Sequence, residues 1–162
     1  MKRSQFLTLG MISMSTMMNL NELYSFSKDI ANSERLPSIF FGHGSPMNAI
    51  QDNVFTQTFK TIGQKFDKPK AIICISAHWE TKGTKITAML EPRTIHDFYG
   101  FPRDLHEIQY PAHGNPALAK DTASLISMKE IILDHEWGLD HGTWSVLRHV
   151  YPNADKIGRA HV

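Results

Sequence analysis

Two histidines stand just after short apolar runs and are candidates for binding one metal ion together. His43 follows Ile39–Phe41, and His78 comes soon after Ala71–Ile75. Neutral imidazole is the commonest metal ligand in proteins, and the glycines on both sides of His43 allow backbone or substrate to approach closely. A lone histidine in such a place is more often a hydrogen-bonded loop residue, so the hypothesis depends on the repetition. Catalytic metals usually take three protein ligands, and the third must come from elsewhere.

The runs before these histidines have the composition of buried strands. Both are continuous apolar stretches containing isoleucine, which is typical of parallel strands covered by helices on both faces. Between them, Asn48–Phe66 has apolar residues at helical spacing and predicts an amphipathic helix. A strand–helix–strand unit would place His43 and His78 at the same edge of one sheet, where ligands of open α/β sheets bind. We therefore expect the two imidazoles to converge.

The rest of the chain predicts further strands and helices. Lys85–Leu90 alternates in polarity and predicts a third strand, and Ile131–Leu133 predicts a short fourth one. Helices are predicted over Pro116–Ile126, where a proline suits the first turn, and over Trp144–Tyr151. The predicted fold class is α/β, with a mainly parallel sheet flanked by helices.

The stretch from Glu91 to Pro116 is rich in proline, glycine and aromatic residues and shows little periodicity. Long irregular loops are often functional, and aromatic surface with a few polar groups can form a pocket for a flat ring. A rigid surface loop packed by its own aromatic residues explains the composition equally well. His96 lies in this stretch, and His141 follows later between an aspartate and a glycine.

The composition of the 162-residue chain is that of an ordinary globular domain, with 41% hydrophobic and 20% charged residues. A formal net charge of +1 with mixed signs gives no reason to expect nucleic acid or stable membrane association, and favours a small, nearly neutral substrate. The one cysteine, Cys74, excludes an internal disulfide framework and is predicted to be a buried, inert thiol.

The two ends of the chain differ from its middle. Residues 1–34 form a leader and linker, of which residues 1–19 have the charged start and apolar middle of an export signal but no evident cleavage site. We expect a cytoplasmic protein, with export as the alternative. Residues 156–162 match the translation of a widely used sequencing-library adapter, so we expect this tail to be non-native and the natural chain to continue past Asp155.

Several short motifs together resemble one family, the class III or LigB-type extradiol ring-cleavage dioxygenases, and within it the 4,5-DOPA dioxygenase-like subgroup. The resemblance covers Leu36 to Asp155, in the family's order and spacing. The motifs are Leu36–Asn48, Ser76–Trp79, Thr94–Phe98, Tyr110–Ala112, and Leu139–Gly142 with Trp144.

The resemblance implies a mononuclear non-haem metal site with His43 and His78 as two ligands. It implies Fe(II) for catalysis, with Zn(II) able to occupy the site in isolated protein, and a catechol-type aromatic ring and O2 as substrates. The family's third ligand and histidine acid/base fall in segments that we do not find before Asp155. We therefore expect residues 35–155 to be the N-terminal portion of the catalytic domain, incomplete at its C-terminal end and inactive by itself. The resemblance also suggests that His141 and His96 contact the substrate or a ligand, although holding a loop is an equal alternative for both.

Two other functions stay open on the sequence. A metal-dependent hydrolase could use the same two histidines to activate a water molecule. A non-catalytic metal-binding fragment would need nothing more than the histidines themselves. Oxygen uptake with a catechol, together with a yellow ring-opened product, would separate the dioxygenase from the hydrolase. Restoring the missing C-terminal segment would separate it from the non-catalytic or incomplete fragment.

Overall fold

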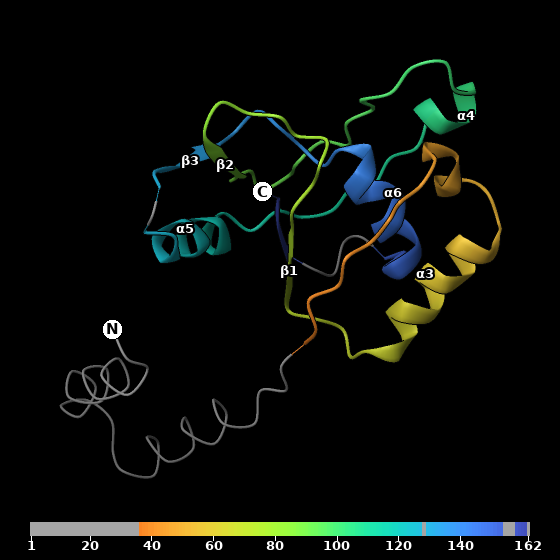
Figure 1. The fold of residues 1–162 in the computed structure, drawn as a ribbon, viewed down its shortest axis with the longest axis horizontal. Coiled ribbons are helices and arrows are strands. Elements are labelled where there is room, and N and C mark those ends of the chain that lie inside the picture. Colours follow the sequence, from red (N-terminus) through yellow and green to blue (C-terminus); the bar gives the residue numbers. More distant parts are fainter. Residues whose placement is uncertain (1–35, 128, 154–157, 162) are drawn as a thin grey trace, which may run out of the picture. The chain divides into compact units, whose positions relative to one another are not determined.

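The computed structural model describes residues 36–127, 129–153 and 158–161, and the leader expected over residues 1–34 lies outside this part. Parallel strands alternate with helices from Ser38 onward, so the α/β prediction is confirmed. The elements in chain order are η1 (Pro46–Ala49), α3 (Val54–Lys65), β1 (Ala71–Cys74), β2 (Thr84–Thr87), α4 (Arg103–His106), α5 (Pro116–Leu125), β3 (Ile131–Asp134), α6 (His141–Val150) and β4 (Gly158–His161) (Figure 1).

The first apolar run does not form the strand that the sequence predicts. β1 forms as expected before His78, but Ile39–Phe41 is neither helix nor strand and pairs with no strand among the described residues. Phe40 is 97% exposed. An apolar run reports a tendency to be buried, whereas a strand also needs a neighbour that satisfies its backbone hydrogen bonds. The predicted strand–helix–strand unit is therefore wrong at its first member.

β1 pairs instead with β4, in the segment that we expect to be a non-native tail. The two strands are parallel, with Ala71 opposite Gly158 and Cys74 opposite His161. Pairing is made by backbone groups that nearly every residue carries, so it does not reveal the origin of the segment. The non-native origin of residues 156–162 stays a prediction.

β2 and β3 form a second two-stranded parallel sheet, where one larger sheet was expected. α5 packs on this sheet, and its Ala119 meets Ile86 of β2 in a buried apolar cluster. The start of α5 is as predicted, because Pro116 occupies the first turn and the Asn115 side chain accepts a hydrogen bond from the N–H of Leu118 at 2.9 Å.

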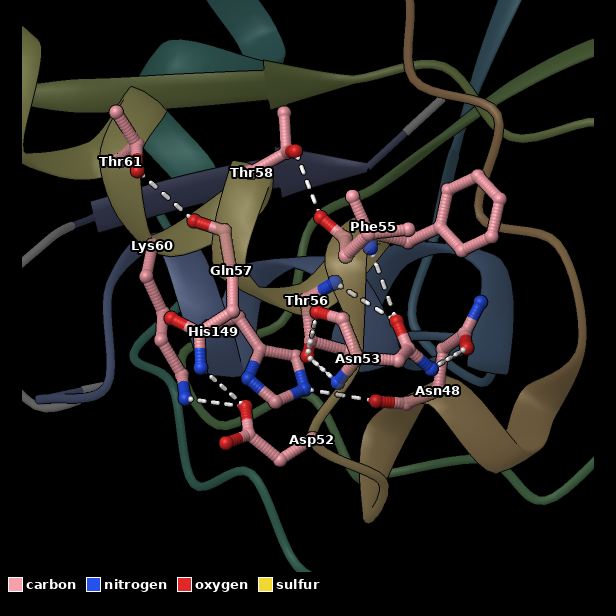
Figure 2. Close-up of polar contacts among 11 residues, drawn as sticks. Asn48, Asp52, Asn53, Phe55, Thr56, Gln57, Thr58, Lys60, Thr61 and His149 are labelled. Atoms are coloured by element: carbon pink, nitrogen blue, oxygen red, sulfur yellow. Dashed lines mark hydrogen bonds and ion pairs between the residues drawn. The ribbon is translucent and has the colours of Figure 1, made fainter.

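The helix predicted over Asn48–Phe66 is in fact two helices, η1 and α3. α3 begins only after Asn53, whose side-chain oxygen accepts hydrogen bonds from the N–H groups of Phe55 and Thr56 at 3.0 and 3.2 Å. The Thr56 hydroxyl in turn accepts a hydrogen bond from the N–H of Asn53 at 2.9 Å (Figure 2). This capping box is a helix start signal inside the apolar pattern, and it decides where the helix begins.

α6 begins at His141 rather than at the predicted Trp144, because the Asp140 side chain caps its first turn with a 3.0 Å hydrogen bond. The helix packs beside α3 (Figure 1). The approach is close at Gly63, where a Cβ atom would lie 2.0 Å from the carbonyl oxygen of Val150. Most of α6 is buried, so its N-terminus is a rigid place for a functional side chain.

The irregular stretch over residues 91–116 is held to α6 and its C-cap by part-buried hydrogen bonds. The indole N–H of Trp144 donates to the carbonyl oxygen of Ile95, and the hydroxyl of Tyr110 donates to that of Tyr151, both at 2.8 Å. Trp144 and Tyr110 are buried in the main apolar cluster, against which the half-buried Cys74 packs. None of the helices in the described part of the chain is long and apolar enough to cross a membrane.

Candidate metal centre

Three imidazoles meet at one point of the structure. The Nε2 atoms of His43 and His78 are 2.7 Å apart, so their predicted convergence is confirmed. One ring nitrogen from each of His43, His78 and His141 lies within 4.8 Å of the other two. The third ligand was expected outside this chain, whereas the structure brings a third imidazole to the same point from the start of α6.

The three histidines of the cluster differ in exposure. His141 is 5% exposed and His43 is half-buried, whereas His78 is exposed. The ring centroid of His141 lies 4.2 Å from that of His78 and 5.1 Å from that of His43. A ligand from solvent would therefore reach the three nitrogens from the side of His78.

Gly142 makes room for His78 against the first turn of α6. A Cβ atom on residue 142 would lie 2.6 Å from Cδ2 of His78 and 3.2 Å from its Nε2. A larger residue would therefore push the His78 imidazole away from the other two rings. This role of Gly142 has no signal in the sequence, because the contact joins segments that are distant in the chain.

Asp97 lies behind His141 and was also missed as a functional residue. Its Oδ1 atom accepts a hydrogen bond from the backbone N–H of His141 at 2.9 Å and lies 2.9 Å from Nδ1 of the same residue. The second contact has the distance of an ion pair without the alignment of a hydrogen bond. A carboxylate beside one imidazole nitrogen orients the ring and makes the other nitrogen more basic.

The pKa of His43 is lowered, which favours the form that binds metal. Burial is the largest cause, and charge on His141 and His78 acts in the same direction, against the opposite effect of Asp140 and Asp97. An imidazole must be neutral to donate a lone pair to a metal ion. His43 therefore meets the first requirement of a ligand at neutral pH.

The cluster fits a divalent transition metal by its donor atoms and nearly by its spacing. Imidazole nitrogen suits both Fe(II) and Zn(II). Two unprotonated nitrogens cannot face each other at 2.7 Å, so a proton or a cation has to lie between His43 and His78. Metal–nitrogen distances of about 2.0–2.1 Å put two ligand nitrogens roughly 3 Å or more apart, so the two rings would separate slightly on binding.

The structure does not bring His96 into the cluster. Its Nε2–H donates to the carbonyl oxygen of Ile108 at 2.9 Å, and its ring centroid lies 5.8 Å from that of Phe98. Phe98 in turn contacts His141, with ring centroids 5.5 Å apart. His96 thus helps to hold its loop one aromatic ring away from the three imidazoles, and a contact with substrate stays a prediction.

An α/β unit with three imidazoles converging at a helix start defines a candidate metal-binding α/β domain. The family model for the catalytic LigB subunit of aromatic ring-opening dioxygenase matches residues 37–161. The chain therefore belongs to the LigB family, as its motifs indicate.

Several known proteins are similar to this chain. The protein named 4,5-DOPA dioxygenase extradiol from Escherichia coli (strain K12) is 50% identical over 127 residues, which cover 78% of this chain and 47% of the relative. A protein of the same name from Beta vulgaris is 40% identical over 124 residues, which cover 73% of this chain and 46% of that relative. The crystal structure of uncharacterized protein JW3007 from Escherichia coli K12 superposes on this chain with a TM-score of 0.57 at 39% sequence identity. The match covers 72% of this chain and 43% of that one. The chain spans about half the length of the curated relatives it matches.

Proposed function

We propose that this chain carries the metal-binding portion of an extradiol ring-cleavage dioxygenase, which opens a catechol-type ring with O2. The observation that carries the proposal is the convergence of His43, His78 and His141 in a chain of the LigB family. The relatives named 4,5-DOPA dioxygenase extradiol support L-DOPA as the first catechol to test.

His43 and His78 would hold the metal, with Fe(II) as the catalytic ion. Bound Fe(II) would supply coordination positions for the catechol and O2 and a path for electron density between them. The exposed side of His78 leaves space for a substrate to enter. The buried side, formed by His141 and the start of α6, would limit access of water.

His141 would accept and return a proton beside the metal ligands. Its Nδ1 lies against Asp97, which leaves Nε2 as the nitrogen available to a substrate. A histidine oriented in this way can act as a general acid or base, typically a contribution of about 10²–10⁴-fold to rate. The same ring is close enough to serve as a third metal ligand. The metal content of a His141→Ala variant separates these two roles.

An aromatic wall beside the cluster suits a flat substrate. Phe98 is buried, and its ring meets that of His141 edge-on at 5.5 Å and that of Phe101 at 5.3 Å. Such apolar surface next to polar groups favours binding of an aromatic ring with two hydroxyls at one end.

The test measures metal binding and oxygen uptake separately. Metal-free chain is titrated anaerobically with Fe(II), alongside His43→Ala and His78→Ala variants that should lose binding. Oxygen uptake with L-DOPA and with unsubstituted catechol is then followed in this chain and in a chimera that adds the remaining C-terminal part of the E. coli relative. The expected result is metal binding by the chain, and oxygen uptake with a coloured ring-opened product by the chimera.

Two results would contradict the proposal in different ways. Equal metal binding by the wild type and both histidine variants would remove the metal site. A metal-loaded chimera that consumes no oxygen with any catechol but hydrolyses ester or phosphoester substrates would favour the hydrolase instead.

A further inference from the structure

Asn48 is a buried amide that holds the segment carrying His43. It is 8% exposed, and its Nδ2 donates a hydrogen bond of 2.9 Å to the backbone carbonyl oxygen of His43. Asn48 ends the motif Leu36–Asn48, but its sequence position alone suggests no role. His43 follows a stretch that pairs with no strand in the described part of the chain, so no sheet hydrogen bond seen there fixes its backbone. The Asn48 amide supplies a bond that a sheet would otherwise provide.

Gly44 shows how tightly the segment wraps around this amide. Its φ angle is 67°, a conformation that glycine adopts readily and other residues do not. A Cβ atom on residue 44 would lie 2.9 Å from Nδ2 of Asn48. Both the backbone turn and the contact with Asn48 therefore favour glycine directly after His43.

Asn48 is itself held from two helices. Its Oδ1 accepts a hydrogen bond from Nδ2 of Asn53, the residue that caps α3, at 2.9 Å. Its backbone carbonyl accepts a hydrogen bond from Nε2 of His149, in the last turn of α6, at 2.8 Å. Figure 2 shows Asn53 and His149 reaching Asn48 from different elements.

Asn48, Asn53 and His149 form a polar junction that links the His43 segment to the helix carrying His141. α6 carries His141 at its first residue and His149 near its last, so the bond from His149 to Asn48 ties the same helix to the His43 segment. The ring centroids of His43 and His141 are 5.1 Å apart. Loss of the junction would let the His43 backbone move relative to a helix that is otherwise fixed by burial.

We propose that Asn48 is a positioning residue that holds His43 in register with His141 and thereby sets the metal affinity of the cluster. The inference rests on the proposed metal site. Partners that orient metal ligands typically contribute about 10–100-fold to affinity, and we expect a loss in this range when the Asn48 donor is removed.

The test compares Co(II) binding by the full 162-residue chain and its variants. Asn48→Asp keeps the size of the side chain and an acceptor for Asn53, but places an oxygen against the carbonyl of His43. We expect its Co(II) dissociation constant to rise roughly 10–100-fold, with altered visible absorption of the bound ion. Asn115→Ala is the control, because it removes the cap of α5, away from the cluster. That control should lower the thermal unfolding midpoint and leave Co(II) affinity unchanged.

A second pair of variants covers the case in which Asn48→Asp does not fold. His149→Ala removes the donor to Asn48, whereas His149→Gln keeps an N–H donor on a side chain of similar reach. We expect weaker Co(II) binding in the first and recovery in the second. Wild-type affinity and absorption in Asn48→Asp, or in His149→Ala, would overturn the positioning role. If wild type and His43→Ala bind Co(II) equally, the metal site itself fails and the role of Asn48 fails with it.

Discussion

The histidine cluster and the β2–β3 sheet both gather ionisable side chains, but only the sheet satisfies them within the fold. In the sheet, Lys85 Nζ lies 2.8 Å from Asp134 Oδ2, and Oδ1 of Asp134 accepts hydrogen bonds from two backbone N–H groups of the following turn. In the cluster, Nδ1 of His43 is buried with no hydrogen-bond partner among the described residues. The Nε2 atoms of His43 and His78 lie 2.7 Å apart and need a proton or a cation between them. Satisfied groups hold a fold together, whereas incompletely satisfied ones mark where a ligand can bind.

The pKa shifts of the two regions have different origins. Burial alone would raise the pKa of Asp134, but the Lys85 ammonium and two backbone N–H groups outweigh it and lower the pKa to about 2. The pKa of His43 is lowered chiefly because the charged imidazole loses water. The lowered pKa of Asp134 comes from hydrogen bonds and an ion pair within the fold. The lowered pKa of His43 comes from the cost of burying a charged imidazole.

The largest expected effect is loss of metal affinity when a cluster histidine is removed. His78→Ala should weaken Fe(II) or Co(II) binding by more than about 100-fold, since the loss of a ligand exceeds the loss of a supporting partner. Asp134→Asn is the matched change in the sheet and should leave metal affinity as it is. Isothermal titration calorimetry with the metal ion measures the affinity of both variants. An equal loss of affinity in the two would contradict the assignment of metal binding to the histidine cluster.

Gly142→Ala should disturb the cluster without removing any of its nitrogens. The new methyl group would overlap the His78 ring, and we expect metal affinity to fall roughly 10–100-fold. Gly42→Ala is the control, because a Cβ atom there meets nothing within 4 Å among the described residues. Metal titration measures the difference. Similar affinities in the two variants would show that the His78 ring adapts freely.

Asp134→Asn should reduce stability rather than binding. The pKa of Asp134 falls from 3.8 to about 2 on folding, and this shift corresponds to about 2 kcal/mol in the free energy of unfolding at neutral pH. Because the folded pKa is below the unfolded one, this contribution is present above pH 3.8 and disappears as the pH falls towards 2. Urea unfolding of both proteins at pH 7 should show the difference. A variant as stable as wild type at pH 7 would mean that the ion pair contributes nothing.

The smallest expected effect is a pH dependence that comes from His149. Its pKa is lowered by burial and by the charges of Arg148 on α6 and Lys60 on α3, against the opposite effect of its hydrogen bonds to the backbone of Asn48 and Ala49. A lowered folded pKa means that the unfolded chain binds the proton first, so stability falls as the pH drops below about 6.5. His149→Gln should flatten the unfolding free energy between pH 7 and pH 5. Identical slopes in both proteins would assign the dependence to other groups.

Much of this protein could be predicted from local patterns. The runs before His78 and over β2 and β3 carry the side-chain pattern of strands, and Pro116 after Asn115 marks the start of α5. The start of α3 also has a local signal, because asparagine is a favoured N-cap residue and Asn53 caps this helix. The single helix predicted over Asn48–Phe66 rested on apolar spacing alone, and that spacing does not mark where a helix begins.

The sequence by itself determined the candidate ligands His43 and His78 and, through its motifs, the LigB family. Only the tertiary structure decided that His141 joins them, that Asp97 lies behind it, and that His96 stays one ring away. Helix and strand propensities depend on residues a few positions apart, so the pattern of residue types along the sequence predicts them. The meeting of imidazoles from a loop, a strand end and a helix start depends on how α6 packs against distant segments. The spacing of residues along the sequence does not predict how α6 packs.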